Sequence, residues 1–488
     1  MTQRDVFELG SSDAENPVTA SPSGPDPLQP RSWPQKRRLW LASGPILVAF
    51  VGNFSISVAV GSIPGVALDF NVSDTQSLAI ISIAAAGFLL APVIAVSVSE
   101  VYGRRVVYVI GLPLSIVFNI VCALVHNYPG LMVVRFLSAF AIAPVVVIGI
   151  GAITDVWDTK GEALGNLMAG LYAAGQIWAT EVGPLAGAGI VHACNDNWRW
   201  AFWLTAMMLG LCAIFILPRA ESFPPTLRRN DRMRRGEQVD QKGNAFWIIA
   251  ISLGRSCHML VKEMLIWPTA LLVGIFQGVL YFFYGAYPLL FSEVFGFTLY
   301  QSVMPFGAVL VGSVVGLAVI SICDKRIYLP SVARAAAAGQ DIPYENRLVV
   351  AIVGGPLMPV ALFWLFYRLA WTAKPTFHWI IPVMAGFLVG VSFIFIMLSM
   401  PLYKNDIYGI HFGASALAAD NIVRYAFSIA VPLFVVPMTQ NLGFPWAIST
   451  MAFISLVTAP VPLIIFLWGR NLRARSLYVK LQQQQESQ

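Results

Sequence analysis

Four charged side chains stand inside otherwise apolar stretches of this chain and are the first candidates for chemistry. They are Arg135, Glu181, Asp420 and Arg424. A charge at the centre of a membrane helix costs about 2.5–3.5 kcal/mol on insertion scales, so such a residue usually faces a partner or a water-filled cavity. A carboxyl in that position can take up and release a proton. The pattern indicates proton movement, or structural ion pairs, inside an apolar protein.

Glu181 lies about two thirds of the way along the apolar stretch 164–190. A carboxyl at this depth could load and release a proton as its surroundings change. It could also be an acid of an outer vestibule that has no part in proton movement. We expect the first of these roles.

Asp420 and Arg424 are four residues apart, so on a helix they share one face and can pair. Such a pair is easier to bury than either charge alone and could serve structure only. Alternatively, Asp420 is a second proton site that opens when Arg424 moves away. We expect the structural pair.

Arg135 lies only four residues after Leu131, where its apolar stretch begins. An arginine so near an interface can extend its stem and place the guanidinium group at the membrane surface. An arginine that stays inside the span marks a functional site by default, because its charge needs a partner. We expect the functional role.

Polar residues on three stretches could line a cavity for a small organic compound. Gln277, Tyr281 and Tyr284 are spaced i, i+4 and i+7, which places them on one helical face. Asn53 and Asn421 lie inside two further stretches. Polar tips on apolar walls are typical of ligand cavities, although an aromatic stripe in a membrane helix can also serve packing alone.

The sequence shows no pattern typical of catalysis. It contains no phosphate-binding glycine loop and no nucleophile–base pair placed for reaction, and its five cysteines are scattered without metal-ligand spacing. We therefore expect no metal, no cofactor and no enzymatic activity.

The elements that must position these residues are apolar stretches long enough to cross a bilayer. Hydrophobic residues make up 57% of the chain and charged residues 11%. A span needs about 20 mostly apolar residues, and continuous rather than alternating hydrophobicity favours helices over a barrel. We expect twelve membrane helices, at 39–60, 78–98, 106–125, 131–152, 164–190, 199–217, 265–288, 302–322, 348–371, 380–401, 414–437 and 445–468.

The basic residues are distributed asymmetrically about these spans. If the N-terminus is cytoplasmic, 26 of the 31 Lys and Arg residues fall on the inner side. This asymmetry follows the positive-inside rule and predicts that both termini face the cytoplasm. The net charge of +6 is therefore explained by topology and does not indicate nucleic-acid binding.

The chain divides at one long polar interruption that has six spans on each side. We expect two six-helix bundles related by a pseudo-two-fold axis along the membrane normal. The predicted divisions are a disordered cytoplasmic tail 1–38, a bundle 39–217, a cytoplasmic loop 218–264 with an interfacial helix, a second bundle 265–468 and a cytoplasmic tail 469–488.

The short inner loop after the second span combines one acid, one glycine and two arginines. Gly103 permits a tight turn. Glu100, Arg104 and Arg105 could form charge-assisted bonds to helix ends across the seam between the halves, and such bonds would act as a gating latch. The alternative is simple anchoring by positive charge.

Several motifs, taken in order, resemble the major facilitator superfamily and, more narrowly, its fungal 12-span drug:proton antiporters. The likeness covers nearly the whole chain after residue 33. It rests on the 6+6 layout and on the segments EVYGRR at 100–105, RFL at 135–137, GPLAG at 183–187, NWRWAFW at 197–203 and AADNIVR at 418–424.

The resemblance implies an all-α transporter that exports a small organic compound, such as a drug, toxin or secondary metabolite, in exchange for protons. It implies a part in proton coupling for Arg135, and an antiporter motif at Gly183, Pro184 and Gly187. Glu181 departs from the family pattern, which has a further Gly-Pro near this position. The expected partners are the substrate, protons and membrane lipids, with a monomer in the plasma membrane.

Two other transport functions and one other class of protein remain open from the sequence. Proton-symport import is possible because motifs do not give the direction. Polyamine export is less favoured, because polycations need several cavity carboxylates and only Glu181 and Asp420 are found. A membrane-embedded enzyme or receptor is disfavoured by the 6+6 symmetry.

Overall fold

The computed structural model describes residues 29–157, 162–219, 221–235, 245–340, 343–370 and 378–486. Within these residues the regular structure is helical, and no strand occurs. This confirms the predicted all-α fold.

The N-terminal half contains six spans built from eight α-helices and one short 3-10 helix. Two spans are interrupted, and the first of them turns through the 3-10 helix η2. The elements are α2 (Gln35–Ser57), η2 (Val58–Ser62), α3 (Ile63–Phe70), α4 (Asp74–Tyr102), α5 (Arg104–Leu124), α6 (Tyr128–Val147), α7 (Gly149–Val156), α8 (Ala163–Ala193) and α9 (Trp200–Ile216).

The C-terminal half contains the other six spans. The segment α17 holds the tenth and eleventh spans and the start of the twelfth. The chain turns between these spans at Gly409 and Gly443, which adopt positive φ angles of 59° and 74°. The elements are α12 (Ile266–Phe295), α13 (Leu299–Val303), α14 (Phe306–Cys323), α16 (Val349–Ala370), α17 (Ile380–Thr458) and α18 (Val461–Arg475).

The predicted twelve spans each coincide with a helix. By length and composition, eight described helices could cross a membrane, and α4 and α9 contain shorter apolar helices. α8 supplies another span, and the long segment Phe412–Arg475 is divided at Gly443 into two.

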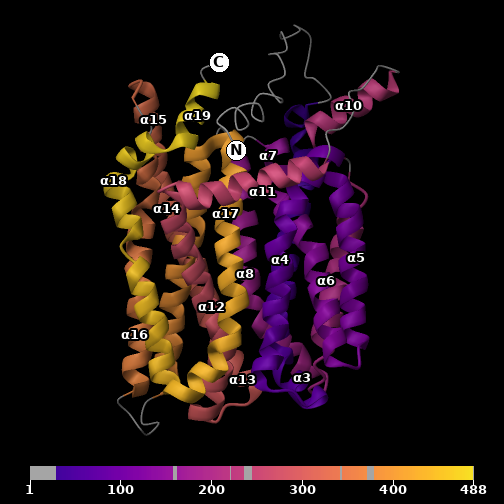
Figure 1. Cartoon of the computed structure of the whole chain (residues 1–488), viewed down its shortest axis with the longest axis vertical. Coiled ribbons are helices and arrows are strands. Elements are labelled where there is room, and N and C mark those ends of the chain that lie inside the picture. Colours follow the sequence, from indigo (N-terminus) through magenta and orange to yellow (C-terminus); the bar gives the residue numbers. More distant parts are fainter. Residues whose placement is uncertain are drawn as a thin grey trace.

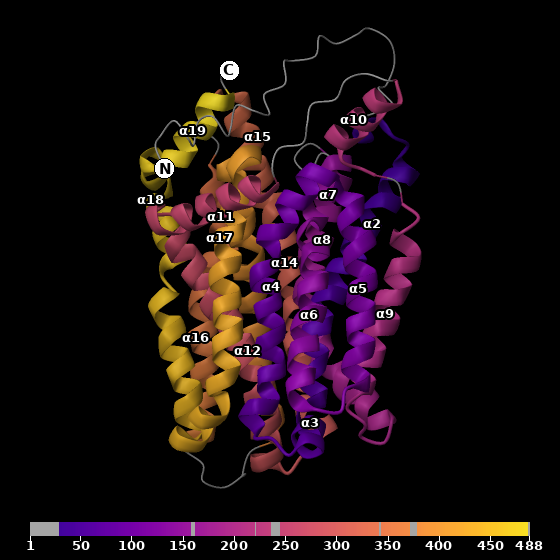
Figure 2. The same ribbon diagram turned by 45° about the vertical axis from the view of Figure 1, so that its right-hand side comes forward.

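The two halves stand side by side, with the first six spans in indigo to magenta and the last six in rose to yellow (Figure 2). Four further helices gather at the end where α2 begins (Figure 1): α10 (Pro224–Arg234), α11 (Ala245–Lys262), α15 (Leu329–Ala337) and α19 (Leu477–Glu486). α11 lies across this end and contacts α4 of one half and α17 of the other.

Glycines allow α8 to lie directly against the first span. A Cβ atom on Gly183 would be 1.8 Å from Ser57 Oγ, and one on Gly187 would be 2.1 Å from the Val58 carbonyl oxygen. Close approach of this kind is typical of small residues at membrane helix interfaces. The GPLAG segment therefore fixes where α8, and with it Glu181, stands relative to the first span.

Candidate transport site

Glu181 lies at the junction of the two halves. Its side chain is completely buried, and Ser313 of α14 donates a hydrogen bond to its Oε2 over 2.5 Å. The other carboxyl oxygen, Oε1, is buried without a hydrogen-bond partner among the described residues. A helix of the N-terminal half is thus joined to a helix of the C-terminal half through a titratable group.

The residues just before Glu181 are held from both sides. Ser57 donates to the Ala179 carbonyl oxygen over 2.9 Å, and Tyr284 of α12 donates to the Thr180 carbonyl oxygen over 2.8 Å. The backbone of α8 at this level is therefore fixed by the first span and by the opposite half.

Asp420 forms its ion pair with Lys404, so the predicted pair with Arg424 is wrong. Lys404 is completely buried, and it also contacts Thr269 Oγ1 at 3.1 Å. Sequence reasoning placed Lys404 in an inner loop, because the apolar run was taken to end at residue 401. The helix continues to Gly409, so Lys404 is inside the bundle.

Arg424 lies among tyrosines. Its Nη2 donates to Tyr425 Oη over 3.1 Å, and its Nε is buried without a partner among the described residues. Its charge also acts on the hydroxyl groups of Tyr172 in α8 and Tyr281 in α12. Arg424 therefore faces groups from both halves.

Arg135 is 1% exposed and does not extend to an interface. It donates to the carbonyl oxygens of Ser55 over 2.5 Å and Ile56 over 3.2 Å. These carbonyls lie where α2 gives way to the 3-10 helix η2, and the change of hydrogen-bonding pattern leaves them able to accept. The guanidinium group also lies 5.3 Å from the ring centre of Phe202.

The predicted cavity residues are closely packed. Gln277, Tyr281 and Tyr284 are at most 6% exposed, and the rings of the two tyrosines are 4.9 Å apart. Asn53 donates to its own helix at the Ala49 carbonyl oxygen and lies 3.5 Å from Gln176 Oε1. Asn421 is partly buried on α17.

The described contacts of the predicted latch are with the N-terminal half and with the loop that follows it. Gly103 makes the turn between α4 and α5 with a φ angle of 92°. Arg104 bonds Asp155 Oδ2 at 3.2 Å and Ser99 Oγ at 2.9 Å, both in the N-terminal half. None of these contacts crosses the seam between the halves, and the gating role of this loop stays a prediction. The side chain of Glu100 lies outside the described residues.

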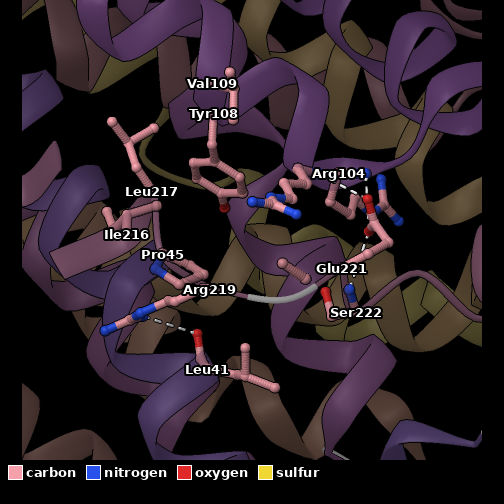
Figure 3. A pocket seen from close by; sticks show the side chains of 12 residues that line it. Leu41, Pro45, Arg104, Tyr108, Val109, Ile216, Leu217, Arg219, Glu221 and Ser222 are labelled. Atoms are coloured by element: carbon pink, nitrogen blue, oxygen red, sulfur yellow. Dashed lines mark hydrogen bonds between the residues drawn. The ribbon is translucent and has the colours of Figure 1, made fainter. Parts of the chain in front are cut away.

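Glu221 is a residue that sequence reasoning missed. Its carboxylate accepts hydrogen bonds from the backbone N–H groups of Arg104 at 3.1 Å and Arg105 at 3.0 Å, which places a negative charge at the N-terminus of α5 (Figure 3). It lines a small pocket together with Tyr108 and Arg219. Burial lowers the pKa of Arg219 to about 10, so this arginine stays charged at neutral pH.

The C-terminal half has a similar charged cluster at the same end. Arg347, before α16, pairs with Asp406 at 3.2 Å, and Tyr328 donates to the same carboxylate over 2.7 Å. Glu345 pairs with Arg473 at 2.9 Å. Each half thus ties its third span to the ends of its later spans.

The described residues contain no group of three His, Cys, Asp or Glu side chains placed to hold a metal ion. The titratable groups inside the spans are instead arranged singly or in pairs between helices. This arrangement suits proton uptake and release, or binding of a charged group.

Comparison with known proteins agrees with this architecture. The profile of the Major Facilitator Superfamily matches residues 46–432. A citrinin biosynthesis cluster MFS transporter of Monascus ruber is 30% identical, over 93% of this chain and 90% of that protein. An efflux pump of Aspergillus terreus is 32% identical over 80% and 82%, and a multidrug transporter of Aspergillus fumigatus is 28% identical over 96% and 77%.

Solved structures share the fold. A D-xylose-proton symporter superposes with a TM-score of 0.64 at 13% identity, over 87% of this chain and 97% of that one. A peptide transporter solved with sulfate gives 0.61 at 13% identity, over 87% and 94%.

The chain belongs to the Major Facilitator Superfamily. It is a multi-pass membrane transporter for small molecules, not an enzyme.

Proposed function

We propose that this transporter is an antiporter that exports a small organic compound in exchange for protons, and that Glu181 carries the proton. The observation that carries the proposal is the bond between Glu181 and Ser313, which joins the two halves inside the membrane. The relatives named as an efflux pump, a multidrug transporter and a biosynthesis-cluster transporter support export of such a compound.

The coupling step follows from the strength of that bond. A hydrogen bond to an ionised carboxylate is about twice as strong as one to a neutral group. Protonation of Glu181 weakens its contact with Ser313, and the halves are then freer to separate at this level. Loss of the proton restores the contact. Alternating access around a central site is the general mechanism of such two-bundle carriers.

Asp420 is the second proposed proton site. A proton on Asp420 would remove the charge that holds Lys404, and the buried ammonium group would then need another partner. Arg135 and Arg424 complete the proposed coupling set, because Arg135 bonds the first span at its bend, and the charge of Arg424 acts on Asp420 in its own half and on Tyr172 in the other.

The proposed cavity is formed by Asn53, Gln277, Tyr281, Tyr284 and Asn421 between the halves. The proposed gating elements are the Gly103 turn with Arg104, Arg105 and Glu100, supported by the Glu221 and Asp155 contacts. We place a functional monomer, surrounded by lipid, in the plasma membrane with both termini cytoplasmic, in accord with the positive-inside distribution. The domain divisions at 38, 217, 264 and 468 are part of this proposal.

The proposal is tested with purified full-length protein in liposomes that hold a pH dye and an acidic interior. Addition of a carried compound outside should raise the internal pH at a saturable rate that protein-free liposomes lack. The probes are 2-naphthoate, its methyl ester and rhodamine 6G. Absence of protein-dependent proton movement with all three would overturn the proposal. In fungal cells, overexpression should lower accumulation of the carried probe, whereas an importer would raise it.

A further inference from the structure

The charged groups inside the described spans do not balance. Apart from the groups near the ends of the spans, such as Asp406 and Arg368, the cations are Arg135, Lys404 and Arg424, and the carboxyls are Glu181 and Asp420. Lys404 and Asp420 neutralise each other, and Glu181 is bonded to a serine. Two guanidinium groups are left. Neither forms an ion pair with a carboxylate among the described residues, and the charge of Arg424 acts on Asp420, which is already paired with Lys404.

These two guanidinium groups act electrostatically on one tyrosine from opposite halves. The charge of Arg135, on α6, interacts with Tyr281 of α12, and so does the charge of Arg424 on α17. The seam between the halves therefore carries a positive field around Tyr281. Buried charges of one sign attract a ligand that carries the opposite charge.

Of the two guanidinium groups, that of Arg424 has hydrogen-bond donors left to bind a ligand. Arg135 already donates to the carbonyl oxygens of Ser55 and Ile56. Arg424 makes one side-chain hydrogen bond, to the neutral Tyr425, and its Nε has no partner among the described residues. A guanidinium group with open donors binds carboxylates and similar planar oxyanions through paired hydrogen bonds.

Aromatic rings lie near Arg424, and its guanidinium carbon is 4.9 Å from the ring centre of Tyr425. Tyr425 lies against Phe88 of α4 with ring centres 5.6 Å apart, and Tyr281 lies against Tyr284 at 4.9 Å. Phe88 and Tyr425 belong to different halves, so their contact must open when the halves separate. Rings of this kind stack on a planar ligand.

We infer that the transported compound is an organic anion: a planar, mostly apolar molecule whose carboxylate or acidic hydroxyl binds Arg424 and whose ring stacks on Tyr281 and Tyr425. This inference deepens the proposed function. It rests on that proposal in taking the bound compound to be the one that is transported. The same excess of positive charge disfavours organic cations and polyamines.

The test is equilibrium binding to the purified full-length protein, followed by tryptophan fluorescence. Three matched probes share one ring system: 2-naphthoate, methyl 2-naphthoate and 2-naphthylmethylamine. The wild type should bind the acid about tenfold or more tightly than the ester or the amine. Arg424→Gln should remove this preference and change binding of the ester less than about twofold. Arg424→Lys should keep part of it, because the charge remains.

Arg334→Gln is the matched control, because it removes one exposed positive charge on α15 far from the seam and should keep the full preference. A wild type without preference for the acid, or an Arg424→Gln variant that keeps it, would overturn the inference.

Binding needs no proton gradient. Acid-selective binding without proton exchange would therefore contradict only the proposed function, and proton exchange with the ester or the cation but without acid selectivity would contradict only this inference.

Discussion

Ser313 of α14 donates a 2.5 Å hydrogen bond to Glu181 of α8, and both side chains are completely buried. The bond joins the two halves inside the membrane, where no water competes for either partner. A bond to a charged acceptor contributes about 1.5–3 kcal/mol. The contact between the halves therefore depends on whether Glu181 carries a proton.

Removal of the serine hydroxyl should favour separation of the halves. In Ser313→Ala, the fraction of molecules whose halves are separated at the outer ends of α8 and α14 should rise about tenfold. This is in line with the strength of one charge-assisted bond. Spin labels at Asn195 and Gln301 report this opening, because His192 and Tyr300 stack at 5.4 Å nearby. The labels are attached to cysteines introduced at these two positions in a protein that has no other cysteine. Double electron-electron resonance then measures the distance between the labels.

Ser321→Ala is the control for this change. Ser321 is on the same helix and bonds only its own helix, at the Leu317 carbonyl oxygen over 2.9 Å. The control should show the wild-type distances. Equal distance distributions for Ser313→Ala and the wild type would contradict the role of the bond.

The buried pair of Lys404 and Asp420 should show strong coupling. Asp420→Asn leaves a buried ammonium group without its counter-ion, which should destabilise the protein by about 3–5 kcal/mol. Lys404→Met combined with Asp420→Asn should recover most of that loss. Denaturant unfolding in detergent measures the four free energies of the wild type, Lys404→Met, Asp420→Asn and the double variant. Asp231→Asn breaks an exposed pair with Arg235 and should cost less than about 1 kcal/mol. Additive costs at 404 and 420 would show that the two groups do not stabilise each other.

Glu221 should stabilise the start of α5. Glu221→Ala removes the acceptor of four backbone N–H groups, two of them at the start of α5, and should cost about 1–2 kcal/mol, as loss of a helix cap does. Glu221→Gln keeps one acceptor oxygen and should cost about half as much. Thermal unfolding gives both values, and the expectation fails if alanine is tolerated as well as glutamine.

Gly183 and Gly170 provide a matched pair on α8. A methyl group at Gly183 would collide with Ser57, so Gly183→Ala should destabilise by about 1–3 kcal/mol. Gly170 has nothing within 4 Å of the same position, so Gly170→Ala should stabilise by about 0.5–1 kcal/mol through its helix propensity. Unfolding free energies of the two variants should therefore change in opposite directions. A neutral Gly183→Ala would contradict the close approach of α8 to the first span.

The spans could be predicted because each is a continuous apolar run, and that signal is local. The partners of the buried charges could not, because they depend on which helices pack together. Lys404 shows this most clearly: it follows the apolar run 380–401 and resembles a loop residue, yet the helix extends past it to Gly409. The nearby Arg424 seemed the better partner for Asp420 because spacing is visible in a sequence and packing is not.

The burial of Glu181 was predicted from its position in an apolar stretch, but its partner was not. Ser313 is one of several serines in apolar stretches, and nothing in its neighbours distinguishes it. Glu221 was missed for another reason: it lies in the polar segment after the sixth span, where a single acid carries no pattern. One signal could have found it: Glu221 is an acid on the same side of the membrane as the two arginines that begin the third span.

Proton movement by Glu181→Gln in liposomes decides whether Glu181 couples transport to protons. Glutamine keeps the size of the side chain and can still bond Ser313, but it cannot be ionised. The variant should bind the transported compound and exchange it across the membrane without any change of internal pH, while the wild type moves protons in the same assay. Proton movement by the variant at the wild-type rate would contradict the proposed coupling.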